Sequence, residues 1–415
     1  MDADVVVVGG GAAGIVVARE LHQAGMRPFE DFVVLDAQPS PGGTWNEGWD
    51  FLRVADADDL VELPGMDVLG LSYAGAAGRE RARDLVPETH RRYEDASDIY
   101  VHRPARVSRV EAIARDRRLR VTYRIGSREP SQLRARVLIN ATGRWSSPFA
   151  PWYPGRDEFA GIQRHAMRLG ATSDLAGARV LVVGGGRSAV AVLRALEGRA
   201  ASTLWATRRP PEFAPVAATT TADLRAARAV LDADAAAVRS AWASASAFTA
   251  SASSTASRSA WAPFETWRGR GFRSMPDVPR PDAYASSVSL TGIPATPAAC
   301  AAVRRGLLVS RGPLERLTPT GAVLADGSRH ELDAVVWATG TRESVRHLAP
   351  LGLRAGGAAP RLRDGWSRID PRIAFVGYGA GYERGRAALD ARRIAEMAID
   401  RADHAEPAER GHAWL

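Results

Sequence analysis

Two stretches of the chain share one pattern: a short run of β-branched apolar residues, a cluster of glycines and a segment with helical spacing. The first, DVVVVGGGAAGIVVARELHQAG, begins at Asp4, and the second, ARVLVVGGGRSAVAVLRALEG, begins at Ala178. A continuous apolar run of this kind is typical of a strand buried on both faces of a parallel sheet. The pattern therefore predicts two α/β units, each with a strand that leads through a glycine turn into a helix.

The first glycine cluster has the spacing GxGxxG. Gly9 permits the tight turn, Gly11 lets a pyrophosphate approach the backbone, and Gly14 lets the helix pack closely on the strand. The helix is predicted to end at Ala24, with Gly25 as its left-handed cap. Its amino end offers free N–H groups to a diphosphate. The residues predicted to bind a dinucleotide at this turn are Gly9, Gly11, Ala12, Ala13 and Gly14.

The strand that follows, FVVLD, ends at Asp36, with Ala37 directly after it. A carboxylate at this distance from the glycines can accept hydrogen bonds from a ribose. Strand, spacing, helix and terminal acid together predict a dinucleotide site, which a lone GxGxxG would not.

The second cluster reads GxGxxA through Gly184, Gly186 and Ala189, with Arg187 and Ser188 inside it. Alanine at the third position is a variant that the fingerprint admits. The next strand, STLWAT, is followed by Arg208 and Arg209, where the first stretch has Asp36. Because a guanidinium can grip a phosphate that a carboxylate would repel, the second turn is predicted to bind NADPH and the first FAD.

The segment PGGTW, which contains Gly43, Thr44 and Trp45, carries a resemblance to a known family. This segment resembles the second glycine motif of class B flavin-dependent monooxygenases, which include flavin-containing, YUCCA-type and Baeyer-Villiger enzymes. FAGIQRH, which ends at His165, is similar to the FxGxxxH core of their fingerprint, although Leu169 and Gly170 depart from its continuation. The resemblance implies a positioning role for His165, whereas a histidine in a loop is more often only structural.

Two matched segments predict where the chain passes between units. Both read ATG: Ala141, Thr142 and Gly143 form the first, and Ala338, Thr339 and Gly340 form the second. The predicted fold is α/β, with two Rossmann-like domains and the NADPH domain inserted into a discontinuous FAD domain. The predicted boundaries are 1–170 and 311–415 for the FAD domain and 171–310 for the NADPH domain, with the active site in the cleft between them.

A third glycine segment, VGYGAG, follows a buried strand near the carboxyl end. Gly377 and Tyr378 are predicted to lie at the flavin. Disulfide reductases with two dinucleotide sites carry an acid at the place of Tyr378, and this chain has one cysteine, Cys300, so a redox-active pair is excluded.

Composition excludes several other chemistries. All 55 basic residues are arginine, so a Schiff-base lysine and a Walker-type lysine are absent. With one cysteine and no HExxH-like spacing, no metal site is expected. The net charge of +8 would suit a nucleic-acid partner. Only WRGRGFRS at 267–274 interleaves arginine with aromatic residues, however, so nucleic-acid binding is not expected. The acidic start and the lack of a long apolar run predict a cytoplasmic protein without a membrane segment.

The Ala/Ser-rich region at about 212–290 is ambiguous. Its first part has helical spacing, and a serine-alanine tract follows. A connector or surface excursion is favoured over a substrate lid. The lid stays an alternative because Trp242, Trp261 and Trp267 lie in this region and exposed aromatic residues tend to cover something.

The cofactors and the resemblance imply an NADPH-consuming, FAD-dependent monooxygenase. It would transfer one oxygen atom from O2 to a small organic substrate through a flavin hydroperoxide, by N- or S-oxygenation or by a Baeyer-Villiger reaction. The heteroatom branch is slightly favoured, since the aromatic-proline-glycine signature after GGxW is not evident. Two alternatives stay open: a reductase that passes electrons to a partner protein, and a flavin-binding protein without turnover. The sequence predicts neither the substrate nor the oligomeric state.

Overall fold

The computed structural model describes residues 2–57, 60, 62–73, 78–114, 116–214, 293–353, 360–377 and 386–403. The chain divides into two compact units, one made of residues 1–147 and 341–415 and the other of residues 148–340. These limits differ from the boundaries expected at 170 and 310 because the segments 148–170 and 311–340 contribute strands to the second unit. Apart from residues 212–214, the predicted Ala/Ser-rich insertion lies outside the described residues.

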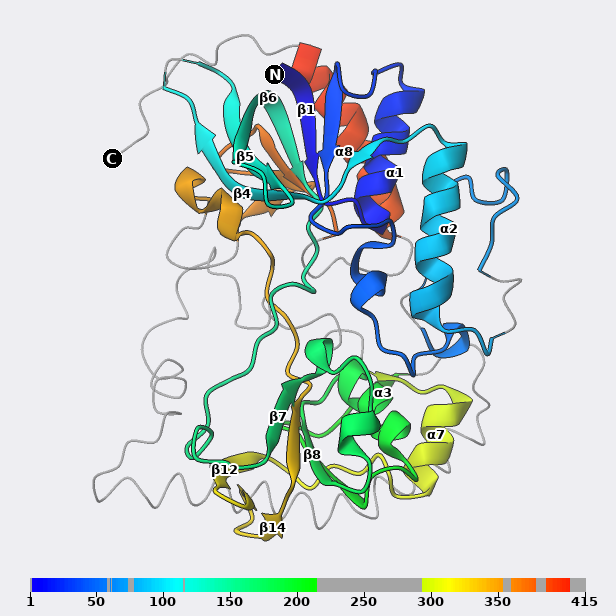
Figure 1. Ribbon diagram of the computed structural model, residues 1–415, viewed down its shortest axis with the longest axis vertical. Coiled ribbons are helices and arrows are strands. Elements are labelled where there is room, and N and C mark those ends of the chain that lie inside the picture. Colours follow the sequence, from blue (N-terminus) through cyan, green and yellow to red (C-terminus); the bar gives the residue numbers. More distant parts are fainter. Residues whose placement is uncertain are drawn as a thin grey trace, which may run out of the picture. The chain divides into compact units, whose positions relative to one another are not determined.

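In the part of the chain that the structure describes, the first unit is built on a nine-stranded sheet (Figure 1). Its strands are β1 (Asp2–Val8), β2 (Phe32–Leu35), β3 (Val101–His102), β4 (Ala105–Ala112), β5 (Leu119–Ile125), β6 (Ser131–Asn140), β16 (Leu362–Arg363), β17 (Trp366–Ser367) and β18 (Ile373–Phe375). The main path runs β16-β17-β18-β6-β1-β2-β3, and β18, β6, β1, β2 and β3 are parallel. β4 and β5 extend β6 as antiparallel strands. The carboxyl ends of five parallel strands therefore meet at one edge.

Both faces of this sheet are covered, which explains the continuous apolar run in β1. Val5 and Val7 belong to one hydrophobic core, while Val6 and Val8 belong to a second core. The helices are α1 (Ala12–Gln23), α2 (Ala82–Ala96) and α8 (Arg386–Asp403), with short 3₁₀ turns η1 (Gly43–Glu47), η2 (Val54–Asp56) and η8 (Arg346–Leu351). α1 and α8 pack side by side in the first core (Figure 1). α1 ends at Gln23, one residue before the predicted Ala24, and Gly25 has the predicted left-handed conformation, with a φ of +92°.

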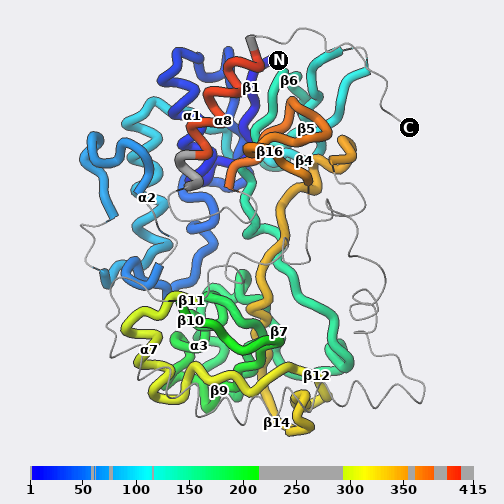
Figure 2. The backbone as a smooth tube through the Cα atoms, turned by 180° about the vertical axis from the view of Figure 1, so that it is seen from behind, coloured from blue at the N-terminus to red at the C-terminus, as the bar shows by residue number. Residues whose placement is uncertain are grey.

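Among the described residues, the second unit has a parallel four-stranded sheet in the order β7-β15-β8-β9. Its strands β7 and β9 are labelled in Figure 2. The four strands are β7 (Ile162–His165), β8 (Arg179–Val183), β9 (Ser202–Ala206) and β15 (Ala334–Trp337). Further elements are β10 (Phe213–Ala214), β11 (Ile293–Pro294), the antiparallel β12 (Leu314–Thr318), β13 (Gly321–Leu324) and β14 (Arg329–Glu331), helices α3 (Arg187–Leu196) and α7 (Pro297–Arg304), and turns η3 (Ala166–Arg168) and η4 (Ser173–Leu175). The predicted α/β architecture is confirmed. Among the described helices, none has the length and apolarity that crossing a bilayer requires.

Candidate cofactor sites

The first glycine turn lies at the carboxyl end of β1, where segments of backbone approach one another closely. A Cβ atom at Gly9 would lie 2.4 Å from the carbonyl oxygen of Ala141, and one at Gly14 would lie 1.8 Å from the carbonyl oxygen of Gly9. Gly9 also has a φ of +108°. A side chain at either position would force apart β1, α1 and the segment after β6, so this turn requires glycine.

The PGGTW segment folds against the first turn. A Cβ atom at Gly43, whose φ is +56°, would lie 2.8 Å from the Cα atom of Gly11. The side-chain amide of Asn46 donates to the carbonyl oxygens of Ser40 (3.1 Å) and Pro41 (2.8 Å) and so fixes this loop. In η1, Thr44 is exposed and Trp45 packs, half-buried, against the core of the unit. Sequence analysis did not identify Asn46, because an amide that accepts and donates within its own loop has no motif.

The first N–H groups of α1 lack partners within the helix. Gly11 precedes the helix and has no side chain with which to cap it, and the first helical hydrogen bond runs from the N–H of Ile15 to Gly11 O at 3.0 Å. The N–H groups of Ala12, Ala13 and Gly14 therefore have no carbonyl one turn earlier in the helix. These donors and the positive end of the helix dipole suit a diphosphate.

Asp36 follows β2 beside this turn and is 5% exposed. Its Oδ2 atom accepts a hydrogen bond from Nε of Arg103 at 3.1 Å, and its Oδ1 atom accepts from the N–H of Gln38 at 3.4 Å. Gly377 comes just after β18 at the same sheet edge, with a φ of +74°, whereas Tyr378 lies outside the described residues. The fold thus brings together Gly9, Gly11, Gly14, Asp36, Gly43, Ala141 and Gly377, with Ala37, Thr142 and Gly143 as chain neighbours.

The second glycine turn repeats this plan in the other unit. Gly184 has a φ of +132°, and a Cβ atom there would lie 2.2 Å from the carbonyl oxygen of Ala338. Gly186 precedes α3 without a side-chain cap, and Ala189 is buried where the helix meets the sheet. The carbonyl of Ala338 thus lies against Gly184 as the carbonyl of Ala141 lies against Gly9. The alanine of each ATG segment therefore packs against one glycine turn. Thr339 and Gly340 follow, and Arg187 and Ser188 start α3.

The residue that corresponds to Asp36 in the second unit is Thr207. The N–H of Gly184 donates to Ala206 O, as the N–H of Gly9 donates to Leu35 O, so the residue after each strand matches. Thr207 is buried, and its hydroxyl lies 2.7 Å from both Ser310 Oγ and Arg209 O. Arg208 and Arg209 follow and are exposed. The predicted arginines therefore stand one and two positions after the acid's place, and a small neutral residue occupies that place.

His165 lies at the end of β7, in a strand and not in the expected loop. Its Nε2 atom lies 3.1 Å from the carbonyl oxygen of Gly340, and its Nδ1 atom accepts a hydrogen bond from the N–H of Met167 at 3.1 Å. This pattern fixes the neutral tautomer with the proton on Nε2. Burial lowers the pKa of His165. Both ring nitrogens are occupied within the unit, and the imidazole joins β7 to the segment that follows β15.

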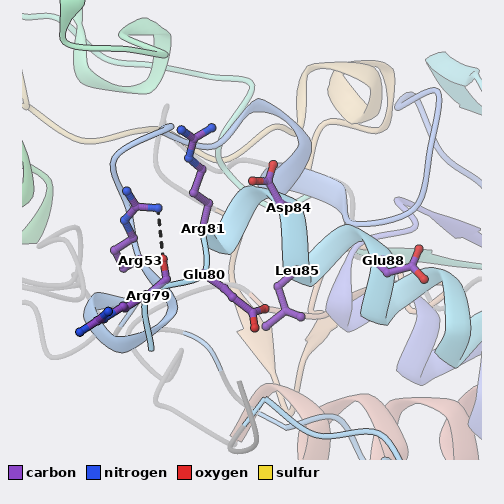
Figure 3. Close-up of a pocket in the computed structure, with 7 residues that line it drawn as sticks. All are labelled: Arg53, Arg79, Glu80, Arg81, Asp84, Leu85 and Glu88. Atoms are coloured by element: carbon purple, nitrogen blue, oxygen red, sulfur yellow. Dashed lines mark hydrogen bonds between the residues drawn. The ribbon is translucent and has the colours of Figure 1, made fainter. Parts of the chain in front are cut away.

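A separate cavity of about 480 Å³ opens at the amino end of α2 (Figure 3). Its lining residues are Arg53, Arg79, Glu80, Arg81, Asp84, Leu85 and Glu88, with Arg53 Nη1 donating to Arg79 O at 3.2 Å. The lining mixes guanidinium groups with carboxylates and includes none of the residues predicted to bind a cofactor. The glycine turns and not this cavity are therefore the candidate cofactor sites.

A family model described as pyridine nucleotide-disulphide oxidoreductase matches residues 6–221, just over half of the chain. The chain belongs to this family. The relatives and solved structures that the chain resembles include flavin-containing and Baeyer-Villiger monooxygenases. The chain has a single cysteine, Cys300, which is buried, so the disulphide chemistry in the family's description has no intramolecular cysteine pair to act on.

The named relatives are distant. A Baeyer-Villiger monooxygenase of Streptomyces coelicolor is 30% identical over 204 residues, which are 46% of this chain and 35% of that protein. The chain thus matches little more than a third of the length of that curated relative. The solved flavin-containing monooxygenase of Stenotrophomonas maltophilia is 28% identical, with a TM-score of 0.67 and coverage of 97% of this chain and 98% of that one. OTEMO in complex with FAD and NADP, 20% identical with a TM-score of 0.60 and coverage of 97% and 85%, shares the fold.

Proposed function

We propose that this oxidoreductase is a monooxygenase that binds FAD at the first glycine turn and NADPH at the second. It transfers one oxygen atom from O2 to a small organic substrate. The observation that carries the proposal is the contrast between two turns of one plan: a buried carboxylate, Asp36, in the first, and a neutral Thr207 followed by two exposed arginines in the second. A carboxylate suits ribose hydroxyls, whereas a guanidinium pair suits a 2′-phosphate.

The described residues fit these cofactors. At the first turn Gly43 lies so close to Gly11 that a side chain at Gly43 has no room, and the amino end of α1 offers its N–H groups to the diphosphate. At the second turn Gly184 has no room for a side chain and Gly186 precedes the uncapped start of α3, while Arg208 and Arg209 would hold the 2′-phosphate. When bound, FAD supplies the redox chemistry by accepting hydride from NADPH and by activating O2.

The protein's own contribution is positioning. His165, with both nitrogens bonded, holds the backbone around Gly340 in place and has no free nitrogen with which to move a proton. The relatives include a Baeyer-Villiger monooxygenase and the indole-3-pyruvate monooxygenase YUCCA6 of Arabidopsis thaliana. Amines, thioethers and ketones are therefore the substrate classes to test.

The test is oxygen transfer itself. The FAD-loaded protein is mixed with NADPH, isotopically labelled O2 and a panel of amines, thioethers and ketones, and the products are examined by mass spectrometry. We expect NADPH oxidation that a substrate stimulates and label in the product. NADPH oxidation that needs an added acceptor protein, with no labelled product, would instead establish an electron-transferring reductase. Failure to bind FAD would reject the proposal.

A further inference from the structure

Arg103 lies beside the first glycine turn and joins three elements that are distant in sequence. Its Nε atom donates to Asp36 Oδ2 (3.1 Å), its Nη1 and Nη2 atoms donate to the carboxylate of Glu94 (2.7 and 2.8 Å), and Nη2 also donates to Gly10 O (3.1 Å). Four of the five guanidinium N–H bonds are thus directed at the end of β2, at α2 and at the glycine turn. The three side chains are 7–9% exposed.

The geometry at Asp36 leaves one oxygen for a ligand. Oδ2 is held by Arg103, while Oδ1 accepts only a long hydrogen bond of 3.4 Å from Gln38 among the bonds that the structure describes. A carboxylate oxygen can accept more than one hydrogen bond. Rotation of the carboxylate is restricted, so Oδ1 is presented in one orientation beside the glycine turn.

Gly10 shows that the turn is shaped around this pair. The fingerprint places no requirement on the residue between Gly9 and Gly11, yet a Cβ atom at Gly10 would lie 2.8 Å from Arg103 Nη2 and 3.0 Å from Asp36 Oδ2. At Gly185, the corresponding residue of the second turn, a Cβ atom would lie 3.7 Å from Thr207, an ordinary contact. A side chain at Gly10 would therefore require Arg103 to shift.

The rest of α2 supports the arrangement. Pro87 packs against Gly42 of the PGGTW loop, and Glu94 binds Arg103. His90 lies between them on the same face of the helix and is 1% exposed. Burial, and then the nearby charge of Arg103, lower the pKa of His90 to about 4, so the imidazole adds no second cation. Arg103 is therefore the cation that balances the two buried carboxylates.

We propose that Arg103 is the positioning residue of the first cofactor site. By fixing Asp36 and the carbonyl of Gly10, it holds the ribose acceptor in the orientation that the adenosine half of FAD requires. This inference rests on the proposed binding of FAD at the first turn.

The test measures ligand affinity and needs no turnover. Flavin-free protein is titrated, by flavin fluorescence, with FAD, with an FAD analogue that lacks both hydroxyls of the adenosine ribose, and with FMN. We expect the parent to prefer FAD over the analogue by roughly ten- to a hundred-fold, the range for a hydrogen bond to a charged group. In Arg103→Met the preference should fall toward one, while the affinity for FMN stays at the parent value.

Further variants separate positioning from folding. Arg103→Met leaves the buried carboxylate of Glu94 without its cationic partner and could unfold the protein. Arg103→Met/Glu94→Gln removes both charges and keeps the test usable in that case. Gly10→Ala should displace Arg103 and lower the preference for FAD, whereas the matched Gly185→Ala should not. Addition of Asp36→Asn to Arg103→Met should cause little further loss, because both act on one contact.

The outcomes distinguish the two proposals. If the parent binds FAD and both Arg103→Met and the double variant keep the full preference over the analogue, the role of Arg103 is wrong and the proposed function stands. The same holds if Gly10→Ala behaves as Gly185→Ala does. If the parent binds no flavin, the proposed function fails and this inference fails with it.

Discussion

Thr207 stands in the second unit where Asp36 stands in the first. Each follows the strand whose last carbonyl accepts the N–H of the turn's first glycine, and each is buried. The position after the second strand therefore holds a carboxylate side chain in one unit and a hydroxyl side chain in the other. An uncharged residue at this place removes the repulsion that a carboxylate would exert on a phosphate.

Removal of the two arginines after Thr207 should change the coenzyme preference. We expect Arg208→Ala/Arg209→Ala to lower the affinity for NADPH by roughly ten- to a hundred-fold, since hydrogen bonds to a charged group contribute about 1.5–3 kcal/mol. The affinity for NADH should change little. Calorimetric titration of both coenzymes measures this, with Arg329→Ala, an exposed arginine of β14, as the control. An unchanged ratio of the two affinities would contradict the assignment of the second turn.

Replacement of Gly43 by alanine should be more damaging than the same replacement at Gly126, a glycine with the same backbone conformation. Gly43 and Gly126 both have a φ of +56°, but a Cβ atom at Gly126 meets nothing within 4 Å, whereas one at Gly43 lies 2.8 Å from Gly11. We expect Gly126→Ala to lower the free energy of unfolding by about 1 kcal/mol, the backbone cost alone. Gly43→Ala should add a loss of FAD affinity, measured by fluorescence titration. Equal effects in the two variants would show that the glycine contact does not shape the site.

His347 should make the fold sensitive to acid. It is 8% exposed, its Nε2 atom lies 3.0 Å from Asn140 Oδ1, and burial lowers its pKa to about 4. The folded state therefore favours the neutral form, and this contribution is complete above the unfolded pKa of about 6.5. As the pH falls from about 6.5 toward 4, up to about 3 kcal/mol of the free energy of unfolding is lost.

Replacement of His347 checks this dependence. We expect His347→Gln to show a shallower decline in unfolding free energy between pH 6.5 and 4, measured by urea denaturation. Above pH 7 the difference between parent and variant should not vary with pH, and this range is the internal control. Parallel curves through the acid range would exclude His347 as a source of the decline.

His165 should affect rate without affecting the pH profile. Its ring nitrogens are both engaged by backbone groups, so it has no nitrogen to offer a substrate. We expect His165→Asn to lower kcat/KM for NADPH several-fold, because a bond that holds Gly340 is lost, while the inflections of the pH–rate profile stay where they are in the parent. Disappearance of an inflection in the variant would instead assign a proton transfer to His165.

The glycine turns, the helix of the first unit and its cap at Gly25 could be predicted because they depend on neighbours in sequence. A buried strand needs apolar side chains on both faces, as Val5 to Val8 show, and a left-handed residue needs glycine. The placement of Arg208 and Arg209 was one residue off because the end of β9 is set by its hydrogen bond to Gly184 and not by its composition.

Other features had no local signal. The unit boundaries at 147 and 340 follow from the pairing of β7 and β15 with β8, strands far apart in the chain. The contact between Arg103 and Asp36 joins residues 67 apart, and no spacing rule ties an arginine after β3 to an acid after β2. Asn46 was missed for a related reason, since its partners are backbone carbonyls that any sequence supplies.

By itself the sequence determined that this chain builds two strand–turn–helix units and that they carry different charges after the second strand. Steric restriction of the backbone and the alternation of apolar residues act over a few positions, so they can be read along the chain. Only the tertiary structure decided which segments meet: Gly43 against Gly11, Ala141 against Gly9, and Arg103 between Asp36 and Glu94. Such contacts depend on the path of the whole chain, because burial brings together groups that no local preference links.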